Sequence, residues 1–381
     1  MSLLWLTILA LPLLAVLIDG TAGVRARGRT FEFGGRTVET FRVLVPIWGR
    51  VEYLQNVDYL RQYGDRVTLC TTGDETDEFY AGLEAIAAAN GFRIFRDRPQ
   101  GRAARARAHT HKQRATSGTI RDRLIRNVLH TVTEPYVVPL DADTTTHQPI
   151  SFLVGELVQR GLDIASIRLV LNNPDDSLLT RLQRFEYRLA MQMRFLAPWM
   201  VSGACQVAKT EVLRDIMDHH SLFFQGNDVE IGVIAQARGH NIGHIPFEVV
   251  TDVPSGLKPW ARQRLAWAGG EFRLFIVNSW LVVKHPFFWF YGGIVAIVGL
   301  FFRWWALTEP GYSLATSVAL YVALAIYVHW KAKNAWLLLM PLYTFVSSMI
   351  LTPLGILWYF KMAIEGHNWG IIRPKRNEPV A

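Results

Sequence analysis

Two aspartates, Asp141 and Asp143, stand one residue apart at the end of the apolar stretch Tyr136-Val-Val-Pro-Leu. In a strand, side chains at i and i+2 point the same way, so both carboxylates are expected at the carboxyl end of a buried strand, where open α/β sheets bind ligands. Such close carboxylates repel each other unless a cation or a proton lies between them. Oxygen ligands with room for phosphate suit Mg²⁺ or Mn²⁺. The pattern predicts a metal–diphosphate site, and the alternative is a pair of solvated carboxylates that cap a loop.

The chain before and around these aspartates alternates strand and helix patterns. Strands are expected at residues 41–46, 67–71, 92–95 and 136–140, and helices at 49–64, 79–90 and 118–131. This alternation indicates an α/β fold with a mixed, mostly parallel sheet and right-handed crossovers. The sequence has neither a Gly-x-Gly-x-x-Gly pattern nor a Walker loop, which argues against a dinucleotide enzyme or a P-loop kinase.

Three later stretches could also contribute to a site. Ser202 and Gly203 lie in a run of small residues that would let a backbone approach a ligand closely. Asp228 precedes a helix expected at 231–238, where an aspartate is commonly an N-terminal cap. A helix from Trp260 to about Lys284 carries Trp, Phe and Leu on one side and Arg on the other, which predicts an amphipathic helix on a membrane surface.

Uncharged apolar runs predict a membrane protein. They cover residues 3–18, 286–302, 312–328 and 335–360, and each approaches or exceeds the roughly 20 residues of a membrane span. Basic residues after the first run place the following domain in the cytoplasm by the positive-inside rule. The expected location is the inner cell membrane, with several spans and a lipid bilayer as partner. The last run is long for one span and holds Pro341 and Pro353, so we expect it to be broken or re-entrant, with a cytoplasmic tail.

Basic residues are concentrated between Arg93 and Arg126, while the net charge of the whole chain is +8. This segment could face phosphate or lipid, or be a solvated surface. It lacks interleaved aromatic residues, so nucleic acid is not an expected partner. The 2 cysteines fit a reducing compartment and form neither a disulfide framework nor a zinc site.

The order of these motifs resembles the membrane-integrated family 2 glycosyltransferases, the inverting GT-A enzymes that include the hyaluronan, chitin, cellulose and Nod-factor backbone synthases. The resemblance covers nearly the whole chain. It implies a GT-A-like nucleotide-sugar-binding domain with transmembrane and interfacial helices. The expected organisation is a membrane anchor at 1–24, a cytoplasmic catalytic domain at 38–258, an interfacial helix at 259–284, a transmembrane cluster at 285–360 and a basic tail at 361–381.

The resemblance also assigns roles to residues. It implies that Asp141 and Asp143 hold Mg²⁺ or Mn²⁺ on the diphosphate of a nucleotide sugar, expected to be a UDP-sugar, and that Asp228 is the general base. The remaining roles divide by substrate. The donor contacts are Asp74, Asp77, Lys112, Arg114 and Arg264, and the acceptor contacts are Ser202, Gly203, Gln263 and Trp267.

Three positions depart from the family pattern. Ala266 replaces the arginine of Gln-x-x-Arg-Trp, with Arg262 or Arg264 as substitutes. Asn227 replaces an acidic residue, and Thr71-Thr72 stands where a carboxylate is common.

The predicted function is metal-dependent transfer of a sugar to a growing polysaccharide, extruded through the chain's own transmembrane helices. The alternatives are transfer of one sugar to a lipid-linked acceptor and a non-catalytic membrane scaffold that binds nucleotide or lipid.

Overall fold

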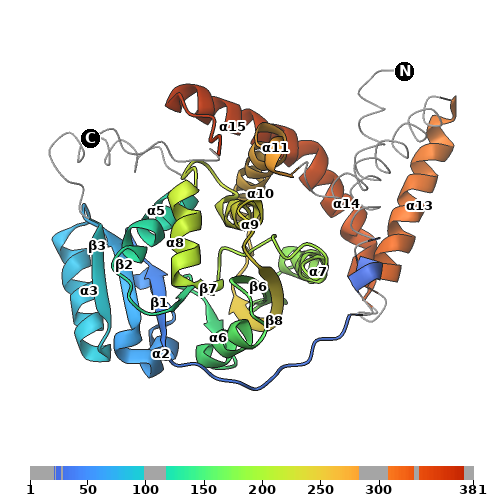
Figure 1. Cartoon of the computed structure of the whole chain (residues 1–381). Coiled ribbons are helices and arrows are strands. Elements are labelled where there is room, and N and C mark those ends of the chain that lie inside the picture. Colours follow the sequence, from blue (N-terminus) through green and yellow to red (C-terminus); the bar gives the residue numbers. More distant parts are fainter. Residues whose placement is uncertain are drawn as a thin grey trace. The chain divides into compact units, whose positions relative to one another are not determined.

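The computed structural model describes residues 21, 23–26, 29–97, 117–282, 308–329 and 334–372 (Figure 1). These residues pack into two compact units. The described parts of Phe31–Asn172, Pro198–Asp252 and His367–Ala381 form one, called here the sheet unit. The described parts of Met1–Thr30, Asn173–Ala197 and Val253–Gly366 form the other, the helical unit.

One mixed sheet forms the centre of the sheet unit. Its eight strands run in the order β3-β2-β1-β4-β7-β6-β8-β5. Their bounds are β1 Phe41–Pro46, β2 Val67–Thr72, β3 Arg93–Asp97, β4 Tyr136–Pro139, β5 Thr145–Thr146, β6 Ile164–Leu171, β7 Val207–Lys209 and β8 Ile242–Thr251. β1 is parallel to both β2 and β4, whereas β7 runs antiparallel to β4 and β6. The predicted α/β fold with a mixed sheet is confirmed.

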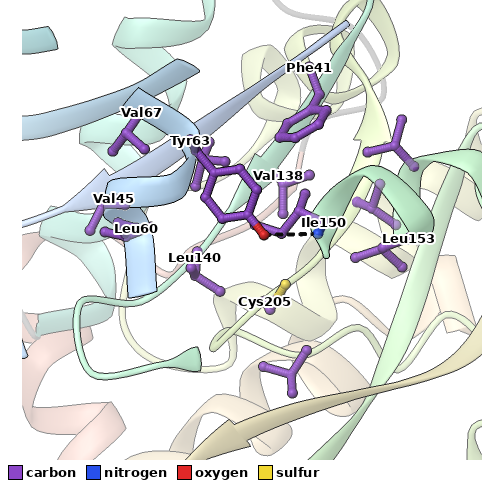
Figure 2. Close-up of a cluster of buried hydrophobic side chains, with 14 of the residues drawn as sticks. Phe41, Val45, Leu60, Tyr63, Val67, Val138, Leu140, Ile150, Leu153 and Cys205 are labelled. Atoms are coloured by element: carbon purple, nitrogen blue, oxygen red, sulfur yellow. Dashed lines mark hydrogen bonds between the residues drawn. The ribbon is translucent and has the colours of Figure 1, made fainter. Parts of the chain in front are cut away.

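The central strands form because they are apolar and can be buried on both faces. Every residue of β1 and of β2 is buried, as expected for parallel strands covered on both sides. Figure 2 shows the core around them, where the Tyr63 hydroxyl accepts a hydrogen bond from the Ile150 amide at 3.0 Å. That amide lies at the first turn of α6, so a core tyrosine supplies a partner for an otherwise open helix N-terminus.

Helices of the sheet unit connect and cover these strands (Figure 1). They are η1 Val51–Tyr53, α2 Val57–Leu60, η2 Arg61–Arg66, α3 Asp77–Asn90, α5 Ser117–Leu129, α6 Ile150–Gln159, α8 Thr210–His219 and α9 Asn227–Ala237. The single helix expected at 49–64 is instead three short pieces. Gly49 and Gly64 both have positive φ angles, and the amides of Gln55 and Asn56 donate to the Ala142 carbonyl rather than to a continuing helix.

The helical unit contains the remaining described elements. They are α7 Leu178–Met193, α10 Leu257–Phe272, η3 Arg273–Val277, α11 Ser279–Val282, α13 Pro310–Val328, η5 Ala335–Leu339, α14 Met340–Phe345, η6 Val346–Leu351 and α15 Thr352–Gly366. The expected arginine face of the helix from Trp260 is not solvated, because Arg264 and Arg273 are only 4% and 0% exposed. The expected place of this helix on a membrane surface stays a prediction.

The predicted membrane location is also corrected. Among the described residues, no helix combines the length and the apolar character needed to cross a bilayer. In the run at 335–360, the residues that join α14, η6 and α15 have helical φ and ψ angles at Phe345, Val346 and Thr352, so the chain does not break at Pro353 as predicted. Apolar residues from this run instead build a core with α7 and α10, formed by Leu182, Phe185, Trp260, Leu337, Met340, Tyr343 and Leu351.

The runs at 3–18 and 286–302 lie outside the described residues, as does the tail beyond residue 372. The expected extrusion of a polymer through transmembrane helices stays a prediction.

Candidate active site

Asp141 and Asp143 follow β4 directly, as predicted. Leu140 pairs with Cys205 in an antiparallel bridge, and the Asp141 amide donates to the Ala204 carbonyl at 2.9 Å. The strand that ends in the aspartates therefore lies beside the Ser-Gly-Ala segment. This backbone pairing is the reason that two motifs some 60 residues apart meet, since neither motif determines it locally.

Asn56, which precedes α2, holds the turn that contains the aspartates. Its side-chain Nδ2 donates to the carbonyl oxygens of Asp141 at 3.0 Å and of Thr144 at 2.7 Å, and its backbone amide donates to Ala142 at 3.2 Å. Asn56 and Thr144 are both buried. Because buried carbonyls need partners, this one side chain fixes the backbone on both sides of Asp143.

Arg121 of α5 joins the separate parts of the site. Its Nε donates to Asp141 Oδ1 at 2.7 Å and its Nη1 to Asp122 Oδ1 at 2.9 Å. Its Nη2 donates to the Gly203 carbonyl. The guanidinium is buried, and although burial disfavours its charged form, Asp141 and Asp122 hold the Arg121 pKa above its usual value. It is therefore a permanent cation between the aspartate turn and the Ser-Gly-Ala segment.

The charge of Arg121 favours the ionised form of the buried Asp122 carboxylate. The Asp122 side chain is 1% exposed, and burial raises its pKa, while Arg121 and then His220 act in the opposite direction. The charge of Asp228 adds a smaller raising effect. The pKa of Asp122 thus depends on the charges of His220, in the loop before α9, and of Asp228, on α9 itself.

Asp228 contacts the Ser-Gly-Ala segment directly. The Gly203 amide donates to Asp228 Oδ2 at 3.0 Å, and the Val229 amide donates to Oδ1 at 3.0 Å. Asp228 is not the cap that was the simpler interpretation, because α9 begins at Asn227 and Gly226 occupies the cap position. The carboxylate lies in the first turn of the helix, where the helix dipole favours negative charge. The structure therefore brings Asp141, Gly203 and Asp228 together through Arg121.

The aspartate pair fits a divalent cation. The Asp143 carboxylate lies at the surface, where it accepts a hydrogen bond from the Thr144 hydroxyl at 3.1 Å. Partial desolvation, then the charges of Asp141 and more weakly Asp252, raises its pKa, so a cation would relieve an unfavourable negative potential. The described residues contain no cluster of three or more His, Cys, Asp or Glu side chains able to hold a metal. Two carboxylates suffice for Mg²⁺-type sites that share the ion with phosphates and water.

The predicted nucleoside contacts lie after β2. Asp74 and Asp77 are both exposed, Asp74 in the turn and Asp77 as the first residue of α3. The carboxylate that faces the strand ends is Glu75, which accepts from the Thr72 hydroxyl and from the Gly49 amide at 3.2 Å. Glu75 therefore links the turns after β1 and β2, a contact that the sequence pattern did not reveal.

The basic segment is only partly described. Lys112 and Arg114, the predicted basic contacts to the nucleotide, lie outside the described residues. Arg121 belongs to the same segment and sequence analysis did not select it. Its only sequence signal was its place among many basic residues, and a single arginine cannot be distinguished there without the tertiary contacts.

The predicted residues Gln263, Arg264 and Trp267 belong to α10 in the helical unit. Arg264 Nη2 contacts Glu186 Oε2 at 2.6 Å and the Tyr343 hydroxyl at 3.2 Å. Its guanidinium lies 4.2 Å from the centre of the Trp267 ring, and Trp267 is only half-buried. Burial opposes the charge, but Glu186 outweighs it and raises the Arg264 pKa. Trp267 is thus held flat against a fixed cation with part of its surface accessible.

A comparison with protein families identifies one match. The family described as glycosyl transferase family group 2 matches residues 136–362, which include β4, the aspartates, the Ser-Gly-Ala segment, α9 and α10.

Curated relatives are N-acetylglucosaminyltransferases. The one from Bradyrhizobium diazoefficiens is 29% identical over 152 residues, which cover 36% of this chain and 31% of the relative. The one from Neorhizobium galegae is 22% identical over 244 residues, which cover 57% of this chain and 56% of the relative. The chain thus spans between about a third and just over half of the length of these relatives.

A solved structure shares the fold. A mannosyltransferase from Pyrobaculum calidifontis, in complex with GDP-Man and Mn²⁺, superposes with a TM-score of 0.53 at 15% identity. The match covers 92% of this chain and 98% of the other. This likeness confirms the GT-A-like fold.

Proposed function

The chain belongs to glycosyl transferase family group 2 and is a glycosyltransferase, and we propose that it moves N-acetylglucosamine from a UDP-sugar to a hydroxyl of a growing glycan with inversion at the anomeric carbon. The names of the curated relatives support the choice of sugar. The observation that carries the reaction type is the hydrogen bond between the Gly203 amide and Asp228, because it joins the proposed base to the Arg121–Asp141 end of the site.

Asp228 would act as the general base. It would take the proton of the acceptor hydroxyl while the hydroxyl oxygen bonds to the anomeric carbon and the bond from that carbon to the diphosphate oxygen breaks. Such proton removal contributes about 10² to 10⁴ in rate. The Gly203 amide holds one carboxylate oxygen in place, and each oxygen retains a further lone pair for the proton.

Asp143 and Asp141 would hold Mg²⁺ or Mn²⁺. When bound, the cation would neutralise the negative charge that develops on the departing nucleoside diphosphate. Arg121 fixes one oxygen of Asp141, which leaves the other oxygen and the Asp143 carboxylate for the ion. We further propose that Asp74, Asp77, Lys112 and Arg114 contact the donor, whereas the buried Arg264 is held by Glu186 and Tyr343.

In the helical unit, acceptor binding would involve Gln263 and Trp267 of α10. Trp267 offers a flat surface, and Arg264 at 4.2 Å from its ring fixes the orientation of the indole by a cation–π contact. A sugar ring would lie on the accessible part of the indole.

The base assignment is tested with Asp228→Asn. Turnover of UDP-N-acetylglucosamine should fall by at least about 10²-fold, while Mn²⁺-dependent affinity for UDP, measured by calorimetry, stays close to that of the wild type. Asp58→Asn removes one charge from an exposed helix position, where the Asp58 side chain is 93% exposed, and should retain full turnover. Substantial turnover by Asp228→Asn would assign the base elsewhere.

The donor and product are tested together. Purified protein is incubated with labelled UDP-N-acetylglucosamine, UDP-glucose or GDP-mannose, and the product is sized. Transfer of several N-acetylglucosamine units to one acceptor supports the proposal. Transfer of only one unit would identify a single-transfer enzyme, and turnover of another donor alone would overturn the choice of sugar.

A further inference from the structure

A strained turn precedes the helix that carries Asp228. Leu222 and Phe224 have φ angles of 50° and 63°, and Gly226 has a φ angle of 85°. Only the glycine adopts this left-handed conformation without cost. Each of the two bulky residues disfavours the turn by about five- to thirtyfold relative to a relaxed backbone. Such strain persists only where the surroundings enforce it.

Glu230 supplies the enforcing contacts. Its Oε1 accepts from the Ser221 amide at 2.6 Å, and its Oε2 accepts from the Ser221 hydroxyl at 2.9 Å. The Ser221 hydroxyl in turn accepts from the Phe223 amide at 3.3 Å. Glu230 is two residues beyond Asp228 on α9 and is fully buried. The same helix turn therefore carries the proposed base and the carboxylate that binds the preceding loop.

His220 completes this arrangement. Its Nδ1 accepts from the Leu222 amide at 3.1 Å, and its Nε2 lies 3.7 Å from Glu230 Oε2. Both side chains are buried. The first residues of the turn are thus attached to Glu230 through Ser221 and through His220, which fixes the path of the chain into Leu222.

Burial also excludes another role for Glu230. Both of its carboxylate oxygens accept hydrogen bonds from Ser221, and its side chain has no exposed surface. A general base must reach the acceptor hydroxyl directly or through one water. Glu230 therefore does not share the proposed role of Asp228, although it lies close to it in sequence.

We propose that Glu230 is a positioning residue for the glycosyl transfer: it holds the strained Ser221–Phe224 turn and thereby sets the first turn of α9 so that Asp228 meets the Gly203 amide. This inference rests on the proposed role of Asp228 as the base. Loss of the hydrogen bonds from Ser221 to Glu230 lets the turn relax. A displacement of about 1 Å at a reacting group lowers the rate by about 10²-fold.

Two substitutions of Glu230 distinguish a positioning role from a direct part in the proton transfer. Glu230→Ala should lower kcat by about 10²-fold, with less than about a threefold change in Mn²⁺-dependent UDP affinity, since the aspartate turn keeps its own contacts. Glu230→Gln keeps the shape and can still accept from the Ser221 amide, so it should stay within about tenfold of wild-type kcat. A folded Glu230→Gln variant as inactive as Asp228→Asn would overturn the proposal.

Relief of strain provides the decisive test. In the Glu230→Ala background, Leu222→Gly removes the cost of the left-handed conformation and should restore kcat by about fivefold or more. Phe223→Gly is the matched control, because Phe223 is the neighbouring half-buried residue without a positive φ angle, and it should restore nothing. Equal rescue by both glycines, or rescue by neither, would contradict the proposal that Glu230 holds the strained turn.

Failure of the Glu230 proposal and failure of the base assignment give different results. If Glu230→Ala fails to bind UDP because it does not fold, the two glycine variants are compared in the Glu230→Gln background. There Leu222→Gly should still give a higher kcat than Phe223→Gly, by less than the roughly fivefold gain expected in the Glu230→Ala background. If Asp228→Asn retains turnover in the same assay, the base assignment fails, whereas the pattern of rescue by Leu222→Gly alone reports on the turn.

Discussion

Arg121 and Asp141 form an ion pair in which Arg121 Nε lies 2.7 Å from Asp141 Oδ1. The two residues come from α5 and from the end of β4, and the same guanidinium reaches Asp122 and the Gly203 carbonyl. The aspartate that we assign to the cation site is thus tied by one side chain to the segment that contacts the proposed base. Changes at Arg121 should consequently affect both stability and substrate binding.

Arg121→Ala should lower the free energy of unfolding by about 3–5 kcal/mol, because it leaves Asp122 buried without its cation. Asp122→Asn in the same background should recover part of that loss without recovering activity. Urea unfolding measures the first effect and turnover the second. Arg61→Ala, which breaks an exposed pair with Asp58, should change stability by less than about 1 kcal/mol, and a comparable loss there would contradict the importance of burial.

Asp143→Asn should stabilise the metal-free protein near neutral pH. The raised pKa of Asp143 means that the folded protein binds this proton more tightly than the unfolded chain. Wild-type stability therefore falls, relative to the variant, as pH rises through the unfolded and then the folded pKa. Below both pKa values the difference disappears. Thermal unfolding followed from about pH 4 to pH 7 measures the trend.

Addition of Mn²⁺ and UDP should reverse the order of Asp143→Asn and the wild type at neutral pH. Ligands that bind only the folded state stabilise it, and the variant lacks the carboxylate that we assign to the ion. Asp58→Asn, at a position on α2 whose side chain is 93% exposed, serves as the control and should respond to Mn²⁺ and UDP as the wild type does. An equal response from Asp143→Asn would remove Asp143 from the metal site.

Asn56→Ala should weaken Mn²⁺-dependent UDP binding and lower the free energy of unfolding by about 1–3 kcal/mol, because the Asp141 and Thr144 carbonyls lose their donor. Asn56→Asp should be worse, since a carboxylate would face two carbonyl oxygens. Asn90→Ala loses a comparable side-chain hydrogen bond, from Asn90 to the Ile86 carbonyl in α3, and should leave UDP binding intact. Calorimetric titration of each variant with UDP in the presence of Mn²⁺ measures the difference.

Gly232→Ala should displace α9 and lower kcat. A Cβ at this position would lie 1.7 Å from the Trp199 carbonyl oxygen, so the helix that carries Asp228 must move, with a stability loss of about 1–3 kcal/mol. Gly82→Ala is the matched helical control. Its Cβ would meet only the Val51 side chain at 3.3 Å, and the gain in helix propensity is worth up to about 1 kcal/mol. Similar kcat values for the two variants would contradict the tight contact of α9.

Local patterns in the sequence were sufficient for much of the fold. β4 and the two aspartates after it follow from one apolar run and the residues that end it. The same holds for β1, β2 and α3, whose expected bounds differ from the observed ones by at most two residues. Strand and helix periodicity depends on neighbouring residues, so it can be detected in the chain alone. The family relationship likewise followed from the order of short motifs.

The apolar run at 335–360 is partly buried in protein, whereas Val318, Leu320 and Ile326 of the run at 312–328 are exposed. Apolar composition indicates burial, but the solvent that burial avoids can be excluded by protein as well as by lipid. Leu337, Met340 and Tyr343 are buried against residues of α7 and α10, and those partners lie far away in sequence. Arg264 was predicted on a polar face for the same reason, since its partner Glu186 lies 78 residues earlier.

The connections within the site were decided by the tertiary structure alone. The aspartates, the Ser-Gly-Ala segment and Asp228 could each be selected from the sequence, because each carries chemistry in a short motif. Arg121 could not, since its role exists only where α5 places it between Asp141 and the Gly203 carbonyl, residues 20 and 82 positions away. Contacts at such separations depend on how strands and helices pack, and packing is a property of the whole chain rather than of any one segment.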